Sequence, residues 1–143
     1  MIRHDLTHWP LVLTVARGAM TPAEHRGLLA EWNRWLDRGE RFATLRVFAD
    51  GDALVHPDGT ARDAGAWLQA NAARMRAQVL GMATVVPAGQ LDCVGRMNAA
   101  KMSGVPAEAF RNISPALDFL GWFIAPPQGG FWDRAAIGLR LHR

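Results

Sequence analysis

The sequence predicts an α/β domain with a small mixed, mostly parallel β-sheet of about five strands, helices packed mainly on one face, and a C-terminal extension. Short apolar runs typical of strands alternate with longer stretches whose apolar residues recur at helical spacing. Glycine- and proline-containing turns separate these stretches. Such alternation implies right-handed crossovers between parallel strands, so only the first strand pair need be antiparallel.

The strands are predicted from short apolar runs. The segment 11–16 is almost continuously apolar, which is typical of a strand covered on both faces. A turn at 7–10, where Pro10 fixes the backbone, separates it from the run 2–6, and a hairpin is therefore plausible. Three more strands are expected, at about 41–48, 82–86 and 109–113.

The first helix has the strongest local signal in the chain. Thr21 can accept a hydrogen bond as N-cap, Pro22 suits the first helical position, and Glu24 completes a capping box. This helix should reach about Arg38 and end at Gly39. Its apolar side chains form one stripe, made of Leu28, Leu29, Trp32, Trp35 and Leu36.

Three further helices are expected. Thr60 with Asp63 predicts the cap of a second helix that reaches about residue 80 and ends at Gly81. The inner stripe of this helix includes Trp67 and Asn71. The asparagine should bond to local backbone groups or lie at the helix edge, and a pocket lined with Asn98 and Arg96 is the alternative. The remaining helices are expected at about 90–102 and 115–124.

Composition narrows the class of protein. The chain has 143 residues, 50% of them hydrophobic, and a net charge of +3, which fits one globular domain. The single cysteine, Cys93, excludes an internal disulfide and a multi-cysteine zinc site. The arginines are dispersed, so no nucleic-acid partner is expected. No apolar run is long enough for a signal peptide or a membrane span, and we expect a cytoplasmic protein.

We divide the chain into a domain at 1–125 and a C-terminal extension at 126–143, which packs on its own subunit or on a neighbouring one. Aromatic residues gather on both sides of the Pro-Gly-rich segment 126–130, and aromatic residues are enriched at interface cores. A homodimer contact is therefore one open alternative, and a tail folded over its own sheet is the other. The interface candidates are Phe119, Trp122, Phe123, Phe131 and Trp132.

A polar loop is the main candidate for a ligand or partner site. It follows a predicted parallel strand, and ligand sites of open α/β sheets favour the carboxyl ends of strands. His56 could carry a proton there, or the loop could simply be solvated, with Thr60 as a helix cap. The candidate residues are Asp50, Asp52, His56, Asp58, Thr60 and Arg62.

Common catalytic signatures are missing from the sequence. It contains no Gly-x-Ser-x-Gly, no Gly-x-Gly-x-x-Gly and no phosphate-binding loop. The acidic loop lacks EF-hand spacing, and His4 and His8 lie in extended or turn-like sequence, so no metal is expected. No cofactor is expected either. Whether the chain is an enzyme stays open, and the missing signatures favour a non-enzymatic role.

The run 9–12 (Trp-Pro-Leu-Val), the helix entry Gly18 with 21–24 (Thr-Pro-Ala-Glu), and the run 81–86 (Gly-Met-Ala-Thr-Val-Val) resemble the STAS superfamily of bacterial anti-sigma factor antagonists. The resemblance covers about residues 1–124 and is closest to stand-alone STAS-like proteins. It implies a small mixed sheet with helices mainly on one side, and docking with a partner protein.

The antagonist branch of that superfamily carries a phosphorylatable residue in an Asp-Ser-Ser/Thr-Gly motif. This chain has no such motif, and Thr60, preceded by Asp58 and Gly59, takes a comparable place at a helix start. We therefore expect a non-enzymatic interaction or regulatory module without that switch. The alternative is a small-molecule-binding or catalytic protein that uses the scaffold as an apolar pocket, by analogy with lipid-binding relatives.

Overall fold

The computed structural model describes residues 1–55, 59–87, 89 and 104–123. These residues form one five-stranded sheet with the strand order β1-β2-β3-β4-β5. The first pair is antiparallel and the other three pairs are parallel, as the sequence predicts. The strands are β1 (Ile2–Asp5), β2 (Leu11–Ala16), β3 (Phe42–Phe48), β4 (Val79–Val85) and β5 (Ala107–Phe110).

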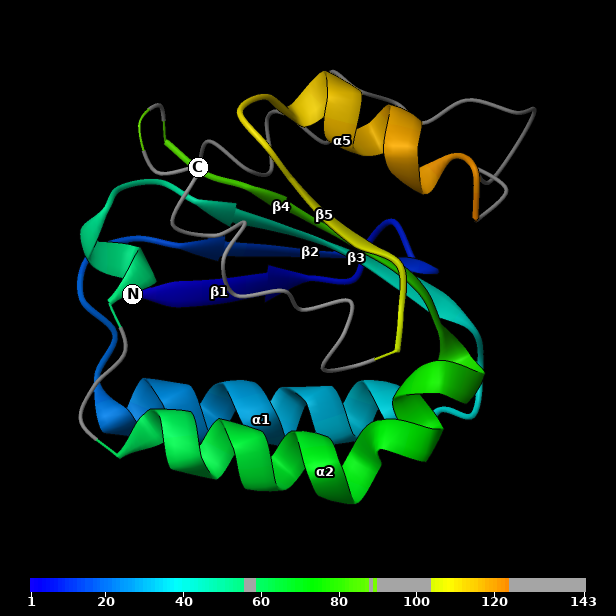
Figure 1. Ribbon diagram of the computed structural model, residues 1–143, viewed down its shortest axis with the longest axis horizontal. Coiled ribbons are helices and arrows are strands. Elements are labelled where there is room, and N and C mark those ends of the chain that lie inside the picture. Colours follow the sequence, from blue (N-terminus) through cyan, green and yellow to red (C-terminus); the bar gives the residue numbers. More distant parts are fainter. Residues whose placement is uncertain (56–58, 88, 90–103, 124–143) are drawn as a thin grey trace.

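Helices cover both faces of this sheet (Figure 1). Helices α1 (Pro22–Asp37) and α2 (Thr60–Gln78) lie side by side under one face, and α5 (Ile113–Leu120) lies on the other. The crossovers from β2 to β3 and from β3 to β4 step in one direction, so right-handed connections place α1 and α2 on the same face. Helix α5 follows the edge strand β5 and folds back over the opposite face.

The start of α1 confirms the predicted capping box. The Glu24 backbone N–H donates to Thr21 Oγ1 at 3.1 Å, and the Thr21 backbone N–H donates to Glu24 Oε1 at 3.1 Å. The helix is followed by Gly39, whose φ of 69° lies in the left-handed region that glycine tolerates best. Both ends of this helix were therefore readable from the sequence.

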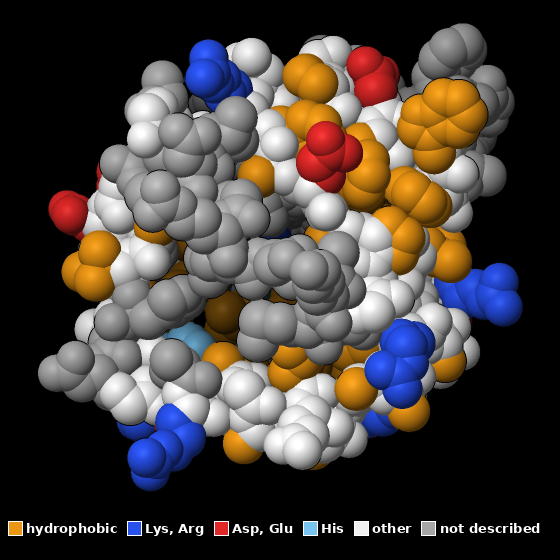
Figure 2. Space-filling model, viewed as in Figure 1, with side chains coloured by type: hydrophobic (Ala, Val, Ile, Leu, Met, Phe, Trp, Pro, Cys, Tyr) orange, Lys and Arg blue, Asp and Glu red, His pale blue; other side chains and the backbone are white. Residues whose placement is uncertain are grey.

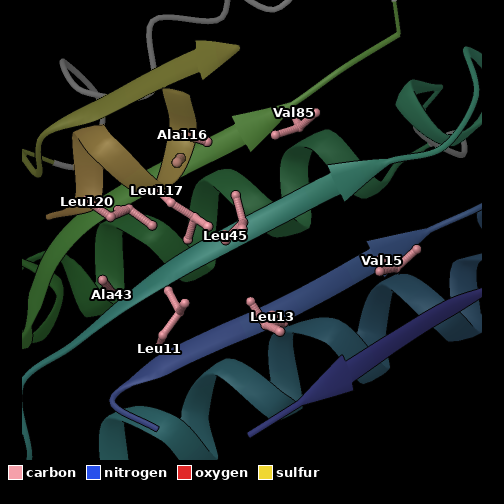
Figure 3. Close-up of a cluster of buried hydrophobic side chains, with 10 residues drawn as sticks. Leu11, Leu13, Val15, Ala43, Leu45, Val85, Ala116, Leu117 and Leu120 are labelled. Carbon is pink, nitrogen blue, oxygen red and sulfur yellow. The ribbon is translucent and has the colours of Figure 1, made fainter. Parts of the chain in front are cut away.

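Two apolar cores share the central strands. On β2, Leu11, Leu13 and Val15 point toward α5, while Val12 points toward α1 and α2. All six residues of β2 are buried, which confirms the expectation of a strand covered on both faces. The core under α5, drawn in Figure 3, consists of Leu11, Leu13, Val15, Ala43, Leu45, Ala83, Val85, Ala116, Leu117 and Leu120.

The boundary between α2 and β4 differs from the prediction. The helix ends at Gln78, the strand begins at Val79, and Gly81 lies inside the strand. A Cβ at Gly81 would lie 3.3 Å from Phe123 Cδ2 and 3.4 Å from Leu120 Cδ2. The prediction that this glycine ends a helix was wrong, because its missing side chain instead lets the α5 region approach the sheet.

Two helix starts also differ from the prediction. The N-cap of α2 is Gly59, with φ of 82°, and Thr60 is the first helical residue rather than the cap. Helix α5 begins at Ile113, so Pro115 lies within the first turn, where its missing N–H would have no intrahelical acceptor. The predicted helix at 90–102 and the extension at 126–143 lie outside the described residues.

Candidate functional site

Asp50, a member of the predicted polar loop, joins two connections. Its Oδ1 and Oδ2 accept hydrogen bonds from the Gly18 backbone N–H at 3.1 and 3.0 Å, and Oδ1 also accepts from the Ala53 N–H at 3.0 Å. The Gly18 hydrogen bond, followed by the Ala53 hydrogen bond, lowers the pKa of Asp50 below its ordinary value. The carboxylate thus fixes the chain after β2 to the chain after β3.

The other loop candidates do not form a described cluster with Asp50. Asp52 and Arg62 are exposed, the first on the short 3-10 turn η1 (Asp52–Leu54) and the second on α2. Thr60 is buried, with 3% of its surface exposed. His56 and Asp58 lie outside the described residues.

The structure describes three of the five aromatic interface candidates. Phe119 is half-buried and packs against Phe110 and Phe123, with ring centroids 5.6 and 5.1 Å apart. Trp122 is 85% exposed and Phe123 is 38% exposed, so part of the cluster reaches the surface after α5. The remaining candidates, Phe131 and Trp132, lie outside the described residues.

A second polar arrangement, which the sequence analysis missed, crosses the sheet on the face toward α1 and α2. The strand register aligns His4 on β1 with Thr14 on β2, Thr14 with Arg46 on β3, and Arg46 with Thr84 on β4. These four aligned residues are called the polar row below. They share their face with Val12, Phe42 and Met82 of the core beneath the helices, because side chains alternate along a strand.

Hydrogen bonds join the polar row in two pairs. His4 Nδ1 lies 2.8 Å from Thr14 Oγ1, and the Arg46 guanidinium donates from Nη2 to Thr84 Oγ1 at 3.3 Å. The His4 ring also meets the Trp35 ring edge-on, with centroids 5.0 Å apart. Burial lowers the pKa of the His4 imidazole, although nearby Glu31 acts in the opposite direction.

Several polar side-chain atoms are buried without a hydrogen-bond partner, and three of them belong to β3 and to the facing helix α1. They are Arg46 Nε, Thr44 Oγ1 and Trp35 Nε1. Thr44 lies two residues before Arg46 on the same face of β3. A buried polar atom without a partner costs about 1–3 kcal/mol, so three of them on one side of a sheet require an explanation.

The charge of Arg46 is also uncompensated within the described part of the chain. No carboxylate there forms an ion pair with Arg46, and burial lowers the pKa of its guanidinium. The side chain is half-buried overall, while Nε is closed to solvent. Carboxylates with other partners in hydrogen bonds or ion pairs include Asp5, Glu24, Glu31, Asp37, Glu40 and Asp50.

Aromatic side chains surround this side of the sheet. Trp35 and Trp32 of α1 pack against each other and against Phe42, with centroid separations between 5.1 and 6.4 Å. Trp67 of α2 joins them and donates from Nε1 to Asn33 Oδ1 at 2.8 Å. Figure 2 shows an opening between the sheet and these helices, with hydrophobic side chains and a histidine visible in it.

The polar row left only a weak signal in the sequence. Strand alternation places Thr44 and Arg46 on the same face as Phe42, so a polar and a charged side chain interrupt an apolar face. That pattern does not reveal whether the face is covered, because burial depends on where α1 and α2 lie.

Asn71 was predicted correctly: its Nδ2 donates to the Trp67 carbonyl oxygen at 2.9 Å.

Comparisons with known proteins matched no family model, no curated protein and no solved structure. The STAS-like resemblance therefore stays a prediction. Within the described ranges, no helix combines the length and apolar character needed to cross a bilayer. The same residues contain no group of three or more histidine, cysteine, aspartate or glutamate side chains placed to hold a metal ion.

Proposed function

We propose that this protein binds a small molecule between the sheet and helices α1 and α2, at the polar row. The observation that carries the proposal is the buried Arg46 Nε with no hydrogen-bond partner, beside Thr44 Oγ1 in the same condition. A ligand that accepts or donates hydrogen bonds there would offset the cost of burying these groups. This is the small-molecule alternative expected from the sequence, with its polar contacts at the polar row in place of the loop that contains His56.

The side chains of the polar row are better suited to binding a ligand than to catalysing a reaction. Its members are one imidazole, two hydroxyls and one guanidinium, and it contains neither a carboxylate nor a thiol. The imidazole Nδ1 is engaged with Thr14. Aromatic and aliphatic side chains around a few polar groups are typical of small-molecule sites.

The test combines two measurements on the full chain. Small molecules that co-purify with the protein are extracted and identified by mass spectrometry, and octanoate, octanamide, benzoate and benzamide are titrated into protein labelled for NMR. We expect backbone shifts at Thr14, Thr44 and Thr84 with at least one probe, and weaker binding in Thr44→Val. Absence of both a co-purified compound and any probe-induced shift on this face would overturn the proposal.

A second candidate function is the non-enzymatic interaction module expected from the STAS-like resemblance. The 85% exposure of Trp122, next to the partly exposed Phe123, favours it because large aromatic side chains are common at interface cores. A homodimer would make the sedimentation coefficient rise with protein concentration, and Trp122→Ser would remove the rise. Two results together argue against this candidate. The protein stays a monomer at every concentration, and wild type captures no host protein that Trp122→Ser fails to capture.

A further inference from the structure

The positive charge of Arg46 on the polar row restricts the chemical class of the ligand. This inference rests on the proposed function. Arg46 is the only lysine or arginine that the described strands place on the face toward α1 and α2, since Arg3 on β1 alternates to the other face. A buried charge is costly unless an opposite charge accompanies it. Within the described ranges, no carboxylate of the protein supplies that charge.

We infer that the ligand carries one carboxylate, which Arg46 binds, on an aliphatic or aromatic body that packs against the core beneath the helices. The guanidinium has five N–H donors in a planar fork that matches a carboxylate, and its hydrogen bond to Thr84 uses one of them. Nε has no hydrogen-bond partner and is closed to solvent. A ligand therefore reaches this donor only when the side chains packed around it move aside.

The neighbouring strands support this geometry. Thr14 and Thr84 flank Arg46, and adjacent strands lie only about 4.8 Å apart. Hydroxyl groups therefore stand on both sides of the guanidinium. The Thr84 hydroxyl accepts from Arg46 and can turn its proton toward an anion, and the Thr14 hydroxyl can do so when His4 Nδ1 carries the proton of their hydrogen bond. Thr44 adds a third hydroxyl on the same strand.

The surroundings favour a singly charged, largely apolar ligand over a phosphate. One guanidinium balances one negative charge, whereas a phosphate dianion in the same place would keep an unbalanced charge. Phe42, Met82 and Trp35 lie on the same side of the sheet and offer apolar surface to the rest of the molecule. A fatty acid and an aromatic acid share this chemistry, and the probes below distinguish them.

The experiment compares each carboxylate with the amide of the same shape. Octanoate with octanamide and benzoate with benzamide are titrated into wild-type protein, Arg46→Met and Arg62→Met by calorimetry. We expect one carboxylate to bind wild type roughly 10- to 100-fold more tightly than its amide, as charge-assisted hydrogen bonds imply. Arg46→Met should abolish this preference, and Arg62→Met, which alters an exposed arginine, should keep it.

A readout on wild-type protein covers the case in which Arg46→Met fails to fold. The Arg46 Nε–H NMR resonance should move downfield on addition of the preferred carboxylate and stay in place with its amide. Equal affinity for both members of each pair, or an unmoved Nε–H signal at saturation, would overturn the inference while leaving the proposed function standing. If no probe binds and no compound co-purifies, the proposed function itself fails.

Discussion

At the scale of single residues, Asp50 shows how a predicted site residue can be structural. Its carboxylate holds the Gly18 and Ala53 backbone N–H groups, and these hydrogen bonds require the charged form. They lower the pKa of Asp50 below 3.8, so its contribution to stability is present above that pH and is lost as the pH falls through the lower pKa of the folded state.

Asp50→Asn should therefore lower the free energy of unfolding at pH 7, and the difference from wild type should shrink as the pH falls below 3.8. Urea unfolding followed by circular dichroism across this range measures it. Asp52→Asn, at an exposed neighbouring position, is the matched control and should change little. An Asp50→Asn effect of equal size at every pH would contradict the argument.

His4 gives a second prediction at the same scale. Burial lowers the pKa of its imidazole below 6.5, so the unfolded chain takes up a proton at a higher pH than the folded chain. The contribution of His4 should leave stability unchanged above pH 6.5 and reduce it as the pH falls toward the lower pKa of the folded state. An NMR titration of the His4 Cε1–H resonance should give a midpoint below 6.5, and a midpoint at or above this value would refute the prediction.

At the scale of elements, α1 is the part of the fold that sequence defines best. Thr21→Ala removes the hydroxyl that accepts from the Glu24 backbone N–H, which should lower the free energy of unfolding by about 1 kcal/mol. Thr21→Ser keeps an acceptor oxygen and should retain most of that stability. Chemical unfolding of the three proteins under one condition measures the comparison, and equal losses in both variants would show that the hydrogen bond is unimportant.

The wrong boundary at Gly81 has a cause that lies far away in the sequence. Gly81 reads as a helix terminator from its neighbours in sequence, but it lies in β4 because α5, more than thirty residues later, needs a close approach to the sheet. The polar row has the same origin, since it exists only when four strands align in register. Local signals such as the Thr21 capping box need no such information, and they were predicted correctly.

At the scale of the whole molecule, the two apolar cores are coupled through the strands they share. Leu13 and Val12 are neighbours on β2, yet the first faces α5 and the second faces α1 and α2. Neither core can lose its packing without disturbing the strands that support the other. The sequence predicted the alternation of strands and helices behind this arrangement, but not which face α5 would cover. No described strand follows α5, so the handedness rule for crossovers does not place it.

Unfolding should therefore be one cooperative transition across both layers. Leu117→Ala, in the core under α5, should lower the free energy of unfolding by about 2–5 kcal/mol, because Leu117 is 1% exposed. The loss should appear equally in far-ultraviolet dichroism and in the indole NMR signal of Trp35, which lies on the opposite side of the sheet. Val55→Ser, at a position that is 61% exposed, should shift both by less than about 0.5 kcal/mol. Separate midpoints for the two signals would show that the layers unfold independently.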